Sequence, residues 1–192
     1  MNGLIICSSE EKRVEYVPLL KGCGINDISF SSGENIRQLV TEKRYDVIIS
    51  VLPFGSGFGL DRVAYISGNT DSEQVVFAPS KVYDEICSKT VGLNISILPK
   101  NVPAAIALNT VRRAAAVKKR LDEAKSENDL LRREADEAKL VFRAKAVLIE
   151  YLKLSESDAH RFIQKRAMDR QTTLAEAAGE VLKTYDYSEN KD

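Results

Sequence analysis

The segment Val47-Ile48-Ile49-Ser50-Val51-Leu52 decides the fold of this 192-residue chain. It is apolar at every position except Ser50, so it lacks the alternation expected of a strand with one face in water. A strand of this kind has both faces covered, as in a parallel sheet with helices on each side. It is followed by Pro53 and the loop Gly55-Ser56-Gly57, residues that stop a strand and turn the chain.

Four further apolar runs repeat this pattern: Leu4–Cys7, Ile28–Phe30, Val75–Ala78 and Ile95–Leu98. Between the runs lie segments long enough for helices, among them Val14–Leu20, Ile36–Val40 and Tyr83–Cys87. Five apolar strands that alternate with helices predict an α/β fold with a five-stranded, doubly wound parallel sheet. We assign residues 1–103 to this sheet domain, because the composition changes after Pro103.

Composition and charge exclude several classes of protein. With 28 Lys and Arg against 28 Asp and Glu, the net charge is zero, which argues against nonspecific coating of nucleic acid but leaves room for a local basic face. No segment approaches the roughly 20 apolar residues of a membrane helix, and the first residues lack a signal-peptide pattern. The three cysteines, Cys7, Cys23 and Cys87, form no CxxC pair. We therefore expect reduced thiols, a cytoplasmic location and no membrane partner.

The predicted strand ends offer little to catalysis. No GxxxxGK[ST] or GxGxxG loop follows the first strand. His160 is the only histidine and lies far along the chain, so the sheet domain cannot assemble a Ser-His-Asp or Cys-His site. Cys7 within an apolar strand is typical of a buried small hydrophobe. We predict that the protein is not an enzyme and has no catalytic residues, metal site or cofactor.

The strand ends resemble the receiver domain of response regulators, which has a flavodoxin-like sheet and a lysine after its fifth strand, here in Leu98-Pro99-Lys100. In that family an acidic pair after the first strand binds Mg²⁺, and an aspartate at the end of the third strand accepts a phosphoryl group. The resemblance places the acidic pair on Ser8 and Ser9, next to Glu10. It places the acceptor on Val51, or on Ser50 if the register slips by one residue.

These replacements have a chemical consequence. Mg²⁺ prefers carboxylate ligands, and an acyl phosphate forms only on a carboxylate. Ser8, Ser9 and Val51 supply none, so we predict a pseudo-receiver that is not phosphorylated on aspartate. A regulatory protein or a small ligand at the degenerate pocket is one expectation, and a fixed dimerising scaffold is the alternative.

A long helix is expected from Ala104, because no Gly or Pro occurs between it and about Leu154. Apolar and small residues recur in it at alternating spacings of three and four, typical of a two-stranded coiled coil. In heptad notation the a positions are Leu121, Asn128, Ala135 and Phe142, and the d positions are Val117, Ala124, Leu131 and Ala138. We predict a homodimer through residues 104–142. An amphipathic helix that lies back on its own protein is the alternative.

The last fifty residues contain two capping boxes, which mark the starts of helices: Ser155-Glu156-Ser157-Asp158 and Thr173-Leu174-Ala175-Glu176. They predict a helix from about Glu156, with an apolar stripe of Ala159, Phe162, Ile163, Ala167 and Met168, and a second helix after Thr173. Together with a first helix that ends near Leu154, they indicate a small three-helix domain over residues 143–187. We expect residues 188–192 to be a disordered tail.

The ordered pattern of this domain resembles the ANTAR domain of the AmiR and NasR transcription antitermination regulators. It comprises Ala144-Lys145-Ala146-Val147-Leu148, Leu154-Ser155-Glu156, Ala159, Ala167-Met168, Leu174 and Ala177. A receiver-like sheet joined to it by a coiled coil matches the full-length architecture of that family. The resemblance implies a dimer that binds tandem stem-loops of nascent leader mRNA and so prevents a terminator hairpin from forming.

The basic and hydroxyl residues of this domain are the candidates for RNA contact, because cations bind phosphates while hydroxyls and Arg planes contact splayed bases. They are Lys145, Arg161, Lys165, Arg166, Arg170, Thr172 and Thr173. One alternative is a solvated helix face, with Glu156, Asp158 and Asp169 as ion-pair partners. A rival function is a protein-interaction regulator whose helical tail docks on another protein. Whether the five cations gather on one face of the domain should distinguish RNA binding from docking on a protein.

Overall fold

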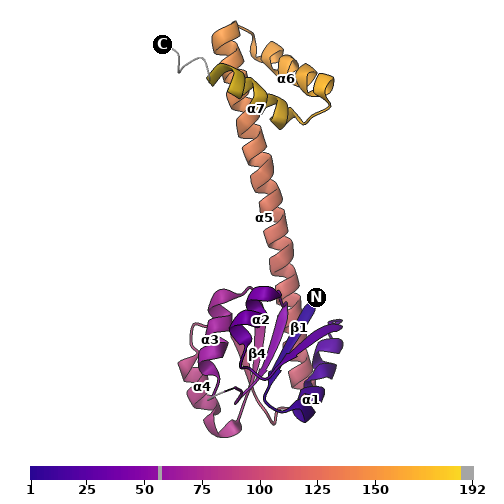
Figure 1. The fold of residues 1–192 in the computed structure, drawn as a ribbon, viewed down its shortest axis with the longest axis vertical. Coiled ribbons are helices and arrows are strands. Elements are labelled where there is room, and N and C mark those ends of the chain that lie inside the picture. The colour runs from indigo at the N-terminus through magenta and orange to yellow at the C-terminus, as the bar shows by residue number, and fades with distance from the viewer. Residues whose placement is uncertain (56–57, 187–192) are drawn as a thin grey trace. The chain divides into compact units, whose positions relative to one another are not determined.

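The computed structural model describes residues 1–55 and 58–186 (Figure 1). The tail predicted at residues 188–192 lies outside these ranges. The chain divides into two compact units, Met1–Glu123 and Ala124–Asp192, and each is described by itself.

The first unit is built on a five-stranded parallel sheet, as predicted. Its strands are β1 (Asn2–Cys7), β2 (Asp27–Ser31), β3 (Val47–Val51), β4 (Glu73–Ala78) and β5 (Ile95–Pro99). Their order is β2-β1-β3-β4-β5, and every neighbouring pair is parallel. The register sets Val51 at the end of β3 beside Cys7 of β1 and Phe77 of β4, so these strands reach the carboxyl edge together.

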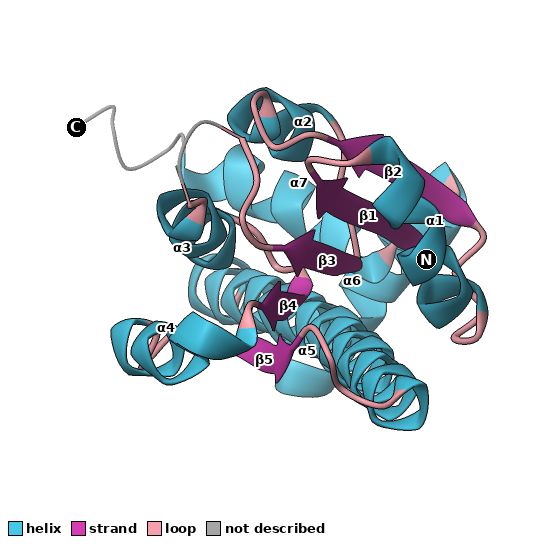
Figure 2. Ribbon diagram, turned by 90° about the horizontal axis from the view of Figure 1, so that it is seen from below, coloured by secondary structure: helices cyan, strands magenta, loops and turns pink. Residues whose placement is uncertain are grey.

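Helices cover both faces of the sheet (Figure 2). One face carries α1 (Glu10–Lys21) and the first turns of α5 (Ala104–Leu152), and the other carries α2 (Ile36–Glu42), α3 (Leu60–Asn69) and α4 (Tyr83–Lys89), which follows the short η1 turn (Ser80–Val82). β3 alternates between these layers, since Val47 and Ile49 pack on the first and Ile48 packs on the second. The apolar strand β3 is thus covered on both faces, as its composition requires.

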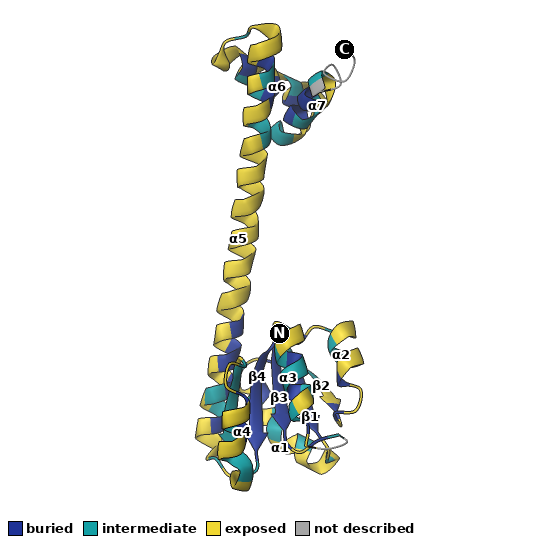
Figure 3. Ribbon diagram, turned by 90° about the vertical axis from the view of Figure 1, so that its left-hand side faces the viewer, coloured by how far each residue is buried: buried dark blue, intermediate teal, exposed yellow. Residues whose placement is uncertain are grey.

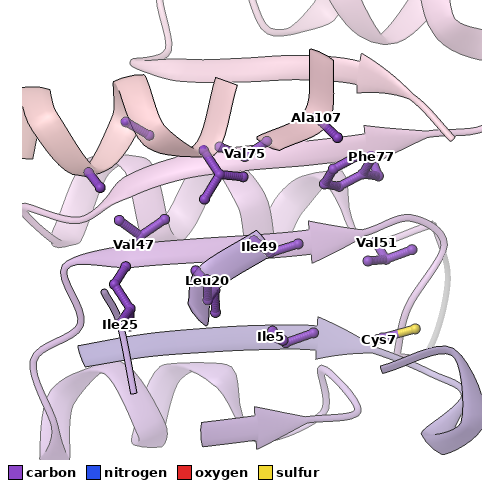
Figure 4. Packing of buried hydrophobic residues seen from close by; sticks show 13 residues of the cluster. Ile5, Cys7, Leu20, Ile25, Val47, Ile49, Val51, Val75, Phe77 and Ala107 are labelled. Carbon is purple, nitrogen blue, oxygen red and sulfur yellow. The ribbon is translucent and has the colours of Figure 1, made fainter. Parts of the chain in front are cut away.

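The first layer shows why α5 begins as part of the sheet unit. Ile5, Ile49 and Phe77 project from neighbouring strands toward Leu20 of α1 and Ala107 of α5 (Figure 4). The α5 side chains in this layer are small: Ala107, Val111, Ala114 and Ala115 are all nearly or fully buried. Small side chains allow the helix to lie close to the strands.

Beyond these turns α5 leaves the core, and every residue from 119 to 139 is exposed (Figure 3). Neither compact unit covers the side chains of this stretch. The predicted dimer seam lies on this exposed stretch and on the turns beside it.

The second unit packs the end of α5 against α6 (Glu156–Arg170) and α7 (Leu174–Asp186). Both capping boxes form: Ser155 Oγ accepts from the Asp158 amide at 3.1 Å, and Thr173 Oγ1 accepts from the Glu176 amide at 3.1 Å. In return Thr173 donates its amide to the Glu176 carboxylate at 2.9 Å. The core of this unit is rich in alanine, with Ala144, Ala159, Ala167, Ala177 and Ala178 beside Leu148 and Ile163.

The predicted apolar stripe of α6 is wrong at two positions. Ala159, Ile163 and Ala167 are buried, but Phe162 is 37% exposed and Met168 is 78% exposed. The reason is the helical repeat of 3.6 residues per turn. Positions 159, 163 and 167 share one face of the helix, while Met168 is turned well away from that face.

Candidate nucleic-acid interface

Two of the predicted RNA-binding cations point outward from α6. Arg161 and Lys165 are both exposed and lie four residues apart, on the side of the helix opposite Ala159 and Ile163. Side chains at this spacing are neighbours on one helix face. They make a paired cationic surface that a phosphate backbone can approach.

Two others, Arg166 and Arg170, meet at the α6–α7 crossing. Arg166 Nε lies 3.3 Å from Glu180 Oε2, and Arg170 Nη1 lies 2.5 Å from the same oxygen. The hydrogen bond from Arg170, and then that from Arg166, lower the pKa of the Glu180 carboxyl. Glu180 therefore stays charged at neutral pH and neutralises part of this cluster.

Lys145 of α5 is held in the same way by the first turn of α6. Its Nζ lies 2.8 Å from Glu156 Oε1, and its side chain is only 19% exposed. The Lys145 hydrogen bond and charge lower the pKa of the Glu156 carboxyl. Of the predicted acidic partners, Glu156 forms its ion pair with a predicted RNA-binding residue, whereas the carboxylate of Asp158 accepts from Ser155 Oγ at 2.6 Å.

The predicted hydroxyls lie in the turn between α6 and α7, and both residues are exposed. Gln171, with φ of 54°, ends α6 in the left-handed region, and Thr172 then donates its amide to the Ala167 carbonyl at 3.0 Å. Thr173 Oγ1 is engaged as the cap of α7. Thr172 therefore has the more available hydroxyl.

The five predicted cations thus do not form one cluster. Arg161 and Lys165 face solvent, while Lys145, Arg166 and Arg170 are ion-paired within the domain. The side chains of Lys145 and Arg166 are only 19% and 27% exposed. Sequence reasoning missed Glu180, because its two partners lie on another helix and no local spacing connects them.

The degenerate receiver pocket holds polar contacts but no carboxylate at the three matched positions. Ser8 Oγ donates to the Pro53 carbonyl at 3.4 Å, and Ser9 caps α1 by accepting from the Lys12 amide at 3.4 Å. Val51 is 2% exposed at the end of β3. Ser50, the alternative for a slipped register, is fully buried inside the sheet. Neither β3 residue has a carboxylate to accept a phosphoryl group.

The remaining two pocket residues are charged. Glu10 is directed into solvent, with its side chain 89% exposed and a 3.6 Å ion pair to Arg13. Lys100 follows β5, where burial and the charge of Lys12 lower the pKa of its ammonium group. Among residues 1–55 and 58–186, no three His, Cys, Asp or Glu side chains gather as a metal site would require.

A hollow of about 330 Å³ lies elsewhere on the sheet unit, between the start of α2 and the start of α3. Its lining is charged and includes Glu34, Arg37, Asp61 and Arg62 beside Tyr65. None of the predicted pocket residues lines it.

The predicted dimer seam is exposed along α5. The exposed fractions are 44% for Val117, 45% for Leu121, 56% for Leu131 and 69% for Phe142. Ala124, Asn128, Ala135 and Ala138 are exposed as well. Large apolar side chains in water favour association. No helix in the described part of the chain is both long and apolar enough to span a bilayer.

Comparison with known proteins identifies one domain of the chain. The family model of the ANTAR domain matches residues 129–182, and such domains belong to an RNA-binding antitermination family. No curated protein matches the chain.

Solved structures similar to the sheet unit are receiver domains and response regulators. The signal receiver domain of an HD domain-containing protein from Pseudomonas fluorescens Pf-5 is 18% identical, with a TM-score of 0.54 over 64% of this chain and 91% of that chain. A receiver domain protein from Clostridium thermocellum is 22% identical, with a TM-score of 0.53 over 62% and 98%. A two component transcriptional regulator AraC from Clostridium phytofermentans ISDg is 12% identical, with a TM-score of 0.56 over 62% and 96%.

At these identities the likeness establishes the receiver-like fold of the sheet. The chain thus combines a receiver-like sheet with a C-terminal region, residues 129–182, that matches the ANTAR domain.

Proposed function

We propose that the protein is a cytoplasmic, RNA-binding transcription antitermination regulator. In this proposal two copies associate through α5 and bind tandem stem-loops of nascent mRNA. The sheet domain responds to a signal other than phosphorylation of an aspartate, carried by a protein or a small ligand.

The exposed pair Arg161 and Lys165 is the observation that carries the RNA-binding part. Both lie on the solvent face of α6 within the ANTAR match, and no ion pair with another described residue is found for either. Cations without internal partners can bind phosphates with no competing carboxylate to displace, and an Arg plane can also stack on a splayed loop base. Thr172 and Arg170 lie near the end of the same helix and extend this surface.

Electrophoretic mobility shift with leader RNAs that carry two hairpins tests the proposal. We expect binding that weakens as salt is added, because phosphate contacts release counterions. RNA crosslinked to the protein in its own cells and then sequenced should identify the target. Failure to bind any structured leader RNA would count against this function.

The sheet domain gives a second prediction. Incubation with labelled acetyl phosphate and Mg²⁺ should leave the protein unlabelled, because Ser8, Ser9 and Val51 provide no carboxylate to hold the metal or accept the phosphoryl group. A receiver domain with its aspartates intact, labelled in parallel, is the control. A stable label on any residue of the sheet domain, located by peptide mass spectrometry, would show that the pocket is active.

A third prediction concerns Glu180, which holds Arg166 and Arg170. The Glu180→Gln substitution keeps a hydrogen-bond acceptor but removes the charge that competes with RNA phosphates. We expect RNA affinity to rise about two- to fivefold, since ion pairs of this exposure are weak, and to depend more steeply on salt. Glu11→Gln, the same exchange at an exposed glutamate of the sheet unit, serves as the control. Equal or weaker RNA binding by Glu180→Gln would mean that the two arginines do not contact RNA.

A second candidate function, docking on a regulatory protein, is favoured by a different observation. Three of the five cations are paired internally, while Phe162 and Met168 of α6 are 37% and 78% exposed. An exposed apolar surface of this kind suits a protein partner. Under this function Phe162→Ser with Met168→Ser would abolish binding to the partner, and RNA would not bind.

A further inference from the structure

The hollow between α2 and α3 is lined by charges of both signs. Glu34 and Arg37 line it from the start of α2, and Asp61 and Arg62 line it from the first turn of α3. Its volume of about 330 Å³ lies at the lower end of the range of about 300 to 1,000 Å³ that is usual for ligand sites. The hollow therefore has room for a small molecule rather than for a large cofactor.

The charges around the hollow do not pair directly with one another. Among the residues that the structure describes, no ion pair joins Glu34, Arg37 or Asp61 to a partner, and all three residues are exposed. Carboxylates and a guanidinium thus face the same hollow at separations longer than an ion pair. A bound molecule that carries both signs of charge would bridge this separation.

Arg37 is oriented by the opposite wall of the hollow. Its Cζ lies 5.0 Å from the centroid of the Tyr65 ring, which is a cation–π contact. Tyr65 belongs to α3 and is half-buried, so this contact joins the two helices. A guanidinium over a ring can still donate from its edge, where its planar fork matches a carboxylate in a bidentate pair.

The lining selects ligands by their charge. A polyanion such as a nucleotide would meet Glu34 and Asp61, and a polycation would meet Arg37 and Arg62. An apolar molecule would displace water from these charges without replacing its hydrogen bonds, which is costly. A small molecule with one carboxylate and one ammonium group avoids all three penalties.

The loops behind the two walls are tied together. The Gly55 amide donates to the Ser32 carbonyl at 3.1 Å, and the fully buried Phe54 ring packs so closely on Gly33, whose φ is 98°, that it leaves no room for a side chain there. The walls are therefore held in place, as is usual for ligand sites. They also lie beside the carboxyl ends of β2 and β3, the edge at which open α/β sheets bind ligands.

We propose that this hollow binds a small zwitterion of the α-amino acid class, with its carboxylate on Arg37 and its ammonium group on Asp61 and Glu34. The inference rests on the proposed function for its role, because it identifies the signal to which the sheet domain responds as a small ligand. It places the sensing site at this hollow and not at the degenerate receiver pocket.

Isothermal titration of the full-length protein with each standard L-amino acid tests the ligand class. We expect at least one of them to bind saturably. Two matched analogues of that amino acid each lack one charge: the amine without the carboxylate, and the acid without the ammonium group. Each analogue should bind at least about tenfold more weakly, because it loses a hydrogen bond between charged groups.

Substitutions in the lining test the site. Arg37→Gln and Asp61→Asn should each weaken binding of the amino acid at least about tenfold. The control for the first is Arg44→Gln, at an exposed arginine outside the hollow. The control for the second is Asp84→Asn, because Asp84 lies in the first turn of α4 as Asp61 does in that of α3, so both changes affect a helix start alike. Both controls should bind like the original protein.

The possible results separate the inference from the proposed function. No binding of any standard amino acid at millimolar concentrations would overturn the inference, and so would equal binding of the analogues or undiminished binding by Arg37→Gln and Asp61→Asn. The titration contains no RNA, so its failure leaves RNA binding by the protein intact. Saturable binding of an amino acid by a protein that binds no leader RNA would support the site and remove the proposed function.

Discussion

The Leu131→Lys substitution is expected to convert the proposed dimer to monomers and raise its dissociation constant at least about 100-fold. Leu131 is the largest side chain at the d positions of the fully exposed stretch. Burying a leucine contributes about 1.5 to 3 kcal/mol, and each dimer loses two. A loss of about 3 kcal/mol corresponds to more than a hundredfold in affinity, and the two lysines repel one another as well. Sedimentation equilibrium measures the change.

The neighbouring residue supplies a matched control. Leu130 is also 56% exposed, but it lies at a c position and points away from the seam. Leu130→Lys should therefore leave the dissociation constant within a few fold of the original. If the two variants dissociate equally, or if neither does, the heptad assignment of α5 is wrong.

Loss of the dimer should also reduce RNA binding. A leader with two hairpins gains from a protein with two linked sites, because the second contact is intramolecular once the first has formed. Leu131→Lys should therefore bind the tandem leader no better than it binds a single hairpin. Retention of the original preference for two hairpins in a monomeric variant would contradict the proposed mode of action.

The Arg161→Ala and Lys165→Ala double variant is expected to lower the affinity for leader RNA by about 100-fold or more. Hydrogen bonds that involve a charged group contribute about 1.5 to 3 kcal/mol each, and two are removed. The slope of log affinity against log salt should become less steep by about two, one for each lost phosphate contact. Titration by fluorescence anisotropy at several salt concentrations measures both quantities.

The control must distinguish the loss of RNA contacts on α6 from the loss of net positive charge. Arg44→Ala with Lys81→Ala removes one arginine and one lysine from exposed positions of the sheet unit, so the net charge falls equally. This control should bind RNA with nearly unchanged affinity. Equal weakening by both double variants would indicate nonspecific electrostatics, and no weakening by the α6 variant would place the RNA interface elsewhere.

Several elements could be predicted because their causes are local. The capping boxes at Ser155 and Thr173 form as expected, since each joins residues three positions apart. Val47–Val51 forms a central strand, because an apolar run of that length must be covered on both faces. The receiver-like sheet and the ANTAR domain follow from ordered patterns of this kind.

Other features could not be predicted, because they depend on residues far apart in the sequence. Phe162 and Met168 were placed in a buried stripe, but the crossing with α7 covers only one face of α6. The same crossing brings Glu180 to Arg166 and Arg170. Apolar character alone does not say which turn of a helix its neighbours will cover.

The amino-acid sequence by itself indicated a receiver-like sheet followed by an ANTAR domain, because periodicity and caps act within a few residues along the chain; the heptad seam stays a prediction. The tertiary structure alone decided which of the predicted cations face solvent and which are ion-paired. Arg161 and Lys165 are left facing water, whereas Lys145, Arg166 and Arg170 each meet a carboxylate of another helix. The physical reason is that an ion pair depends on distance in space, and packing sets this distance only once the three helices have assembled.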